Sequence, residues 1–155
     1  MKRAGAMGLV AIMIVGSVFG CGSGGGEDAT TTLTPHQFLF RVSRACKQVE
    51  HEKYAGFEHA FKALAAGTGE LNPSQADLRK LTLEVAVPTL ERLPEQLATM
   101  SPPPSLKEKT ERLIAAMESE IEAIKREPDR YVNGLAFTKT DKAAFALHVS
   151  QCTLG

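Results

Sequence analysis

Tryptophan is missing from this chain, and aromatic residues make up only 6% of its 155 residues. Proteins that bind sugars or single-stranded nucleic acids often stack their ligands on aromatic side chains, so this composition argues against both classes. The formal net charge is +0. Without an excess of basic residues the chain has no strong field to attract nucleic acid or an anionic membrane surface. We therefore expect no nucleic-acid partner.

Long hydrophobic runs are also scarce. One run extends from Met7 to Phe19, about thirteen residues, whereas a membrane-spanning helix needs roughly twenty. Basic Lys2 and Arg3 precede this run, and small Gly20 follows it. A basic start, a short apolar run and a small residue are typical of an export signal. A plain secretory signal and a transmembrane anchor are the alternatives.

A cysteine stands directly after the small residue. Val18, Gly20 and Cys21 resemble the lipobox of bacterial lipoproteins, although Phe19 is bulkier than the usual residue at its position. The resemblance implies that residues 1–20 are removed as a lipoprotein signal peptide and that Cys21 receives a diacylglycerol thioether. It also implies that the new amino group is acylated, for example with palmitate. The protein would then be extracytoplasmic and lipid-anchored to the cell membrane, or to the outer membrane of a cell with two membranes.

The next stretch, residues 21–34, is rich in glycine and threonine. Such a composition cannot bury a core and is typical of a flexible tether, with an r.m.s. span of roughly 20 Å. Residues 35–155 remain, enough for one domain with a sizeable core. Removing Lys2 and Arg3 leaves 16 of the 18 basic residues against 18 acidic ones, so the mature chain has a net charge of about −2.

The chain has only three cysteines. With Cys21 lipidated, Cys46 and Cys152 remain, and an oxidising compartment favours a disulfide between them. A redox pair or a metal site is less favoured, because the spacing fits neither a Cys-x-x-Cys motif nor a zinc knuckle. The bond would close a loop of about 106 residues. By lowering the entropy of the unfolded chain it would stabilise the fold by roughly 4–5 kcal/mol.

No segment shows the sustained period-two alternation of a strand, whereas helix signals recur. Thr34 as N-cap, Pro35 at the first position and Gln37 at the third predict a helix that ends near residues 67–69. One face of it is apolar; that face contains Phe38, Val42, Ala45, Val49, Gly56 and Ala60.

A second helix is expected to start in the same way at residues 72–75 and to end at the prolines of residues 101–104. Pro88 and Pro94 lie inside it. Because Pro88 has no N–H to donate and crowds the preceding turn, we expect a kink or a break near Val87.

A third helix is predicted to start with a Ser105–Glu108 capping box and to be interrupted by Pro128, with one more helical turn over residues 129–132. Thr138 is expected to cap a short last helix. Its inward face would contain Ala144, Phe145, His148 and Cys152. Together these segments predict an all-α fold, an antiparallel bundle of about four helices whose second helix is kinked or broken by proline.

One polar cluster in the first helix is the candidate metal site; it consists of Glu50, His51, Glu52, Tyr54, Glu58 and His59. His51 and Glu58 share a face, as do Glu52 and His59, and such pairs can bind a divalent cation. A bundle metal site also needs ligands from a second helix, and the third helix has no histidine. We therefore favour a solvated face with ion pairs such as Glu58–Lys62 and predict no metal.

Catalytic motifs are lacking as well. The serines have no nucleophile-elbow context, no glycine-rich phosphate loop follows a strand, and the haem signature is missing. His148, a lone histidine on a mostly apolar face, is expected to be a packed residue rather than a ligand or a base. We predict neither catalytic residues nor a cofactor.

Three stretches, residues 38–46, 93–104 and 151–155, resemble those of a group of small bacterial lipoproteins that is common in high-GC Gram-positive bacteria. The resemblance implies a helical domain with a disulfide between its first and last helices, and it implies no activity.

From these observations we expect a cell-envelope lipoprotein that acts as a non-catalytic interaction or structural module and has an envelope protein as its partner. Two alternatives stay open. One is a carrier that holds an apolar ligand between helices opened at Pro88 and Pro94, and the other is a metal-binding protein that uses the cluster in the first helix.

Overall fold

The structure is a computed structural model that describes residues 33–69 and 72–154. Cys21, the predicted signal peptide and nearly all of the predicted tether lie outside these residues. The described part contains helices and no strand, which confirms the all-α prediction. Its elements are α1 (Pro35–Thr68), α2 (Gln75–Leu81), a π-helical segment (Thr82–Ala86), α3 (Val87–Ala98), α4 (Lys107–Arg126), α5 (Asp129–Val132), α6 (Thr138–Leu147) and a 3-10 turn (Ser150–Cys152).

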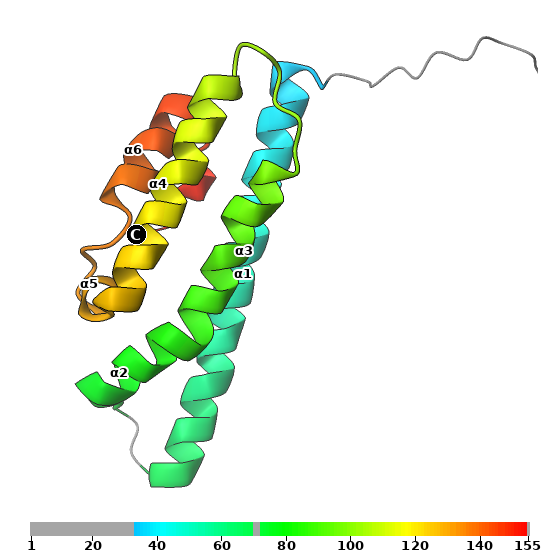
Figure 1. Cartoon of the computed structure of the whole chain (residues 1–155). Helices are drawn as coiled ribbons and strands as arrows, with labels where there is room; N and C mark the ends of the chain where they lie inside the picture. Colours follow the sequence, from blue (N-terminus) through cyan, green and yellow to red (C-terminus); the bar gives the residue numbers. More distant parts are fainter. Residues whose placement is uncertain (1–32, 70–71, 155) are drawn as a thin grey trace, which may run out of the picture.

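The helices pack mainly in chain order. α1 lies against α3, α3 against α4 and α4 against α6, and the 3-10 turn returns to α1 (Figure 1). α1, α3, α4 and α6 contribute apolar faces to one core, where Phe38, Leu90 and Met117 are fully buried. Each such side chain stabilises the fold by about 1.5–3 kcal/mol. Among the described residues no helix has both the length and the apolarity needed to cross a membrane.

The ends of α1 are those that the sequence predicts. The Thr34 hydroxyl accepts a hydrogen bond from the Gln37 N–H (3.3 Å), and the Gln37 side chain accepts one from the Thr34 N–H (3.0 Å). At the other end Gly69 has a φ of 72° and donates its N–H to Ala65 O. Glycine adopts this left-handed conformation without strain, so the helix stops there.

Two predicted starts are displaced by local hydrogen bonds. α2 is capped by Ser74 rather than Asn72, because Ser74 and Asp77 exchange hydrogen bonds between their side chains and backbones. The prediction that Ser105 caps the third helix is wrong. α4 begins at Lys107 without a side-chain cap, since a turn in which the Leu106 N–H donates to Pro103 O (2.9 Å) leads into the helix.

The predicted kink near Val87 occurs as a change of helix type. The π-helical segment Thr82–Ala86 precedes α3, and Pro88 lies in the first turn of α3, where a missing N–H does little harm. The segment packs against α1 at Gly56, where a Cβ atom would approach Val85 Cγ1 to 2.8 Å. Pro94, by contrast, is buried inside an uninterrupted α3, so this helix has no break where the carrier alternative supposed an opening.

The start of α6 depends on a distant residue. Glu120 of α4 is 9% exposed, and its carboxylate accepts hydrogen bonds from the N–H groups of Lys139 (2.8 Å) and Thr140 (2.9 Å). Thr138 was expected to cap this helix, but Phe137 occupies the N-cap position with a φ of 69° and makes no side-chain cap. The carboxylate therefore satisfies N–H groups that a helix start leaves free.

The inward face of α6 also differs from the prediction. Thr140, Ala144 and Leu147 are buried, whereas Phe145 is 62% exposed. His148 is exposed too, because α6 ends at Leu147 and His148 turns away with a φ of 62°. The expectation that Phe145 and His148 pack inward is therefore wrong.

Cys46 and Cys152 form the disulfide that the sequence predicts. Their sulfur atoms lie 1.93 Å apart and their Cα atoms 5.0 Å apart, a usual Cα separation for a disulfide. Both residues are fully buried. The bond joins α1 to the 3-10 turn and so attaches the last segment of the domain to its first helix.

Candidate functional site

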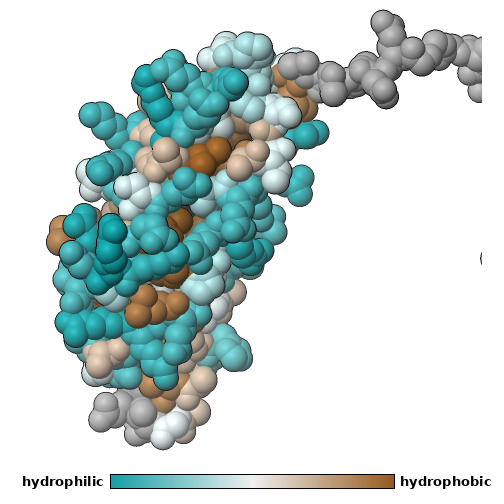
Figure 2. Space-filling view, in the orientation of Figure 1, coloured by the Kyte–Doolittle hydropathy of each residue, from teal (hydrophilic) through white to brown (hydrophobic). Residues whose placement is uncertain are grey.

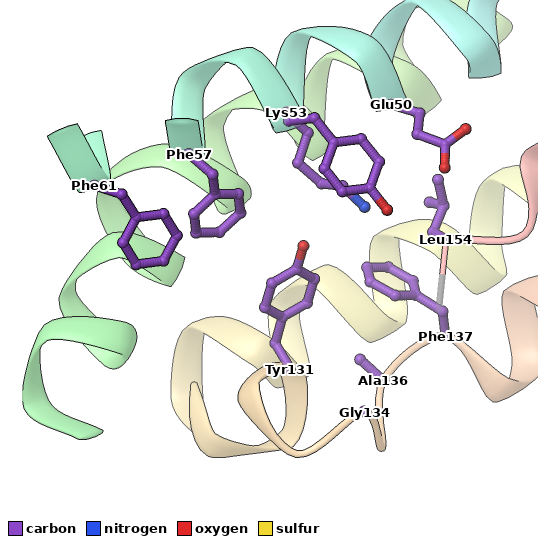
Figure 3. Close-up of a pocket in the computed structure, with 10 residues that line it drawn as sticks. Glu50, Lys53, Phe57, Phe61, Tyr131, Gly134, Ala136, Phe137 and Leu154 are labelled. Atoms are coloured by element: carbon purple, nitrogen blue, oxygen red, sulfur yellow. The ribbon is translucent and has the colours of Figure 1, made fainter. Parts of the chain in front are cut away.

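A pocket of about 360 Å³ lies between the second half of α1 and the segment that connects α5 to α6 (Figure 3). Its volume is at the lower end of the range for small-molecule sites. The lining residues are Glu50, Lys53, Tyr54, Phe57 and Phe61 from α1, and Tyr131, Gly134, Ala136, Phe137 and Leu154 from the C-terminal part.

Aromatic rings form much of the wall. The Phe57 ring stacks with Phe61 at a centroid distance of 6.0 Å and with Tyr131 at 6.3 Å. Tyr131 meets Phe137 edge to face at 6.2 Å. Such pairs hold each other in place. In a chain with few aromatic residues, this continuous row joins α1, α5 and the N-cap of α6.

Lys53 is the one charged side chain buried in this wall, at 5% exposure. Its Nζ lies 5.1 Å from the centroid of the Tyr54 ring and 5.9 Å from that of Tyr131, within range of a cation–π interaction. No ion pair involves Lys53 within residues 33–69 and 72–154. Burial lowers the pKa of Lys53, and the nearby charge of Glu50 opposes that shift.

Tyr131 supplies a hydroxyl group to the pocket. Its side chain points from α5 toward α1 (Figure 3). Burial, with a smaller effect of Tyr54, raises the pKa of Tyr131 to about 12. The phenol therefore keeps its proton at neutral pH and can donate a hydrogen bond.

A tight connection positions Tyr131 and Phe137. The Gly134 N–H donates to Tyr131 O (3.1 Å), and the Leu135 N–H donates to Arg130 O (2.8 Å). Gly134 has a φ of 68°, which favours glycine at this turn. Leu135 is 65% exposed, and Tyr54, which lines the pocket, is 62% exposed.

The polar cluster predicted as a possible metal site does not come together. Glu52 pairs with Arg92 (2.8 Å) and accepts a hydrogen bond from Gln48 (3.0 Å), which lowers the pKa of Glu52, with Arg92 adding to the effect. Glu58 pairs with Lys62 (2.5 Å), as expected.

The remaining members of the cluster divide between solvent and the pocket. His51 and His59 are exposed, while Glu50 and Tyr54 line the pocket. Among the described residues no group of three or more His, Cys, Asp or Glu side chains is placed to hold a metal ion.

Sequence reasoning missed Lys53, although a signal was present. Lys53 follows Val49 by four residues and precedes Phe57 by four, so it occupies a place in the apolar stripe of α1. Its charged neighbours in sequence made it look like part of a solvated face.

Apolar side chains on the outer surface are scattered. Phe40, Leu83 and Phe145 are exposed on three different elements. On the face shown in Figure 2, hydrophilic side chains predominate and apolar ones form separate spots. That face offers no continuous apolar patch of the kind that marks many protein interfaces.

Comparisons of the chain with protein-family models, with curated proteins and with solved structures found no match.

Proposed function

We propose that this protein is a lipid-anchored lipoprotein of the cell envelope whose helical domain binds a small ligand with an apolar body and catalyses no reaction. The pocket between α1 and the α5–α6 connection carries the proposal. Its aromatic walls offer an apolar ligand about 25 cal/mol for each Å² of surface that leaves water.

The composition of the pocket favours ligand binding over a protein partner. A protein interface is usually built around an exposed cluster of large side chains, whereas Phe57, Tyr131 and Phe137 are at least half-buried and line a hollow. The hollow lies away from Pro88 and Pro94, where the sequence suggested an opening for a ligand. A compact ligand of about a dozen heavy atoms, at about 0.3–0.5 kcal/mol each, would bind with a Kd of roughly 1 mM to tens of µM.

Filling the pocket tests the binding proposal. The neutral aromatic compound 2-naphthamide serves as the probe ligand. Ala136 lines the pocket, so Ala136→Phe should fill part of the pocket volume and abolish binding of this probe, measured by isothermal titration calorimetry. Ala146→Phe adds the same side chain on an exposed part of α6 and should leave binding unchanged. Equal binding by the wild type and both variants would place the ligand elsewhere and refute the proposal.

The anchor is tested separately. Cys21 follows Gly20 in the lipobox-like stretch, so Cys21→Ala should leave the signal peptide uncut or release the protein from the membrane. Partition of cell extracts into a detergent phase measures the change. The acyl chains are what would hold the domain at the membrane. If the variant partitions as the wild type does and differs from it in mass only by the substitution, Cys21 carries no lipid.

A further inference from the structure

We infer that the pocket selects an anionic ligand, a carboxylate with an apolar body, and that Lys53 is its counterion. This inference rests on the proposed ligand-binding function. The observation behind it is a buried lysine that lies in a ligand-sized hollow and forms no ion pair with any residue the structure describes. A charged side chain buried without an opposite charge destabilises a fold, so its presence at an otherwise apolar position calls for a compensating partner.

The groups that face Lys53 do not neutralise it. Glu50 lies one turn earlier on α1, but no ion pair joins it to Lys53, and its carboxylate points toward Leu154 in Figure 3. Tyr54 and Tyr131 contribute ring faces. A neutral phenol and a ring face attract a cation weakly compared with a carboxylate.

The pocket has a polar part and an aromatic part, and each suits a different end of the ligand. The Lys53 ammonium and the Tyr131 hydroxyl both project into the space between α1 and α5 (Figure 3), so one carboxylate can accept hydrogen bonds from both. Phe57, Phe61 and Phe137 then receive the apolar body of the ligand.

A cationic ligand is the opposite possibility, since aromatic cages often bind quaternary ammonium groups. Here the ammonium of Lys53 already occupies the ring faces of Tyr54 and Tyr131. The Lys53 ammonium would repel a second cation, and this repulsion is strong in a poorly solvated space. Glu50 also lines the pocket, but its carboxylate points toward Leu154 (Figure 3), so a ligand carboxylate beside the Lys53 ammonium is attracted more strongly than Glu50 repels it.

Two probes with the same ring system and different charge test the inference. The full-length protein, solubilised in detergent, is titrated at neutral pH with 2-naphthoate and with neutral 2-naphthamide, and the same micelles without protein give the blank. The wild type should bind 2-naphthoate at least about tenfold more tightly, the value of one charge-assisted hydrogen bond. Lys53→Met, which keeps the apolar stem, should reduce 2-naphthoate binding to the level of 2-naphthamide.

Lys47→Met is the matched control, because Lys47 is exposed on the same helix outside the pocket. It should leave both affinities unchanged. Equal binding of the two probes by the wild type, unaltered by Lys53→Met, would refute the choice of an anion and leave the proposed binding function intact. Failure of both probes to bind at millimolar concentration would refute the proposed function, and this inference with it.

Discussion

Lys53, the proposed counterion of the ligand, is a buried charge that lowers the stability of the ligand-free fold. It is 5% exposed and lacks an ion-pair partner among the described residues. A hydrophobic residue of similar length would fit the stripe between Val49 and Phe57 without that cost. Natural binding sites often carry such trade-offs between stability and function.

We therefore predict that Lys53→Met stabilises the ligand-free protein at neutral pH. Burial lowers the pKa of Lys53 from its ordinary value of 10.5, so between the folded-state pKa and about 10.5 the unfolded chain holds more protons than the folded one. The contribution of Lys53 to wild-type stability should rise with pH across that window, because the penalty of the buried charge disappears. The excess stability of Lys53→Met should therefore shrink toward pH 10.5, as measured by chemical denaturation at several pH values.

Lys47→Met again serves as the control, and its difference from the wild type should show no such pH-dependent loss. A Lys53→Met variant less stable than the wild type at pH 7 would mean that the contacts of the ammonium with the Tyr54 and Tyr131 rings outweigh its desolvation.

The site was harder to predict than its parts. Glu50 and Tyr54 belong to the cluster that the sequence suggested as a possible metal site, and both line the pocket instead. The opposite wall comes from Tyr131 to Phe137, about eighty residues away. Asn133 and Gly134 indicate the turn locally, but no local pattern reveals that it packs against α1. The burial of Lys53 follows from that long-range contact.

At the scale of elements, α1 and the π-helical segment approach closely where Gly56 faces Val85. The predicted effect of Gly56→Ala is a net destabilisation of about 1 kcal/mol. The added Cβ would lie 2.8 Å from Val85 Cγ1, and overpacking of this kind costs about 1–3 kcal/mol. Alanine has a higher helix propensity than glycine, which offsets up to about 1 kcal/mol of that loss. Thermal unfolding measures the balance.

Gly67 offers a matched control in the same helix, since nothing lies within 4 Å of a Cβ added there. Gly67→Ala should stabilise the protein by about 0.5 kcal/mol, because only the propensity term remains in the last turn of α1. If Gly56→Ala stabilised the protein as much as Gly67→Ala, the close approach of the helices would not be a constraint.

A second prediction at this scale concerns the cap that α4 gives to α6. Glu120→Ala leaves the N–H groups of Lys139 and Thr140 without their acceptor, and the loss should be about 1–2 kcal/mol. Glu118→Ala, at an exposed position of α4, should change stability by less than about 0.5 kcal/mol. Urea denaturation distinguishes the two, and similar losses in both variants would argue against a capping role.

These two helices also show why some boundaries were predicted and others not. Thr34 and Gln37 form a cap from residues three apart, so the start of α1 is readable locally. The cap of α6 comes from Glu120, about twenty residues earlier, and local reasoning assigned it to Thr138. Pro88 indicated a disturbance, but the sequence did not reveal that a π-helical turn would absorb it.

At the scale of the whole molecule, the disulfide connects the first helix to the last turn across a separation of 106 residues. Cys152→Ser should destabilise the protein by roughly 4–5 kcal/mol, because the unfolded chain regains the entropy of a long open loop. Guanidinium denaturation of oxidised wild type and variant measures the difference.

The double variant Cys46→Ser with Cys152→Ser indicates the source of that loss. If the cross-link is responsible, the single and double variants should be about equally stable. A double variant that is much less stable than the single one would show that packing of the buried sulfur atoms contributes most.

The position of Cys152 also determines when this fold can be completed. A chain is made from its N-terminus, so α1 emerges first and carries Cys46 as a free thiol while every later helix is still to come. The bond can form only after α6 and the 3-10 turn have appeared. The bond therefore cannot form before almost the whole domain has been made, and a chain that stops before Cys152 leaves Cys46 without the partner that it has in the fold.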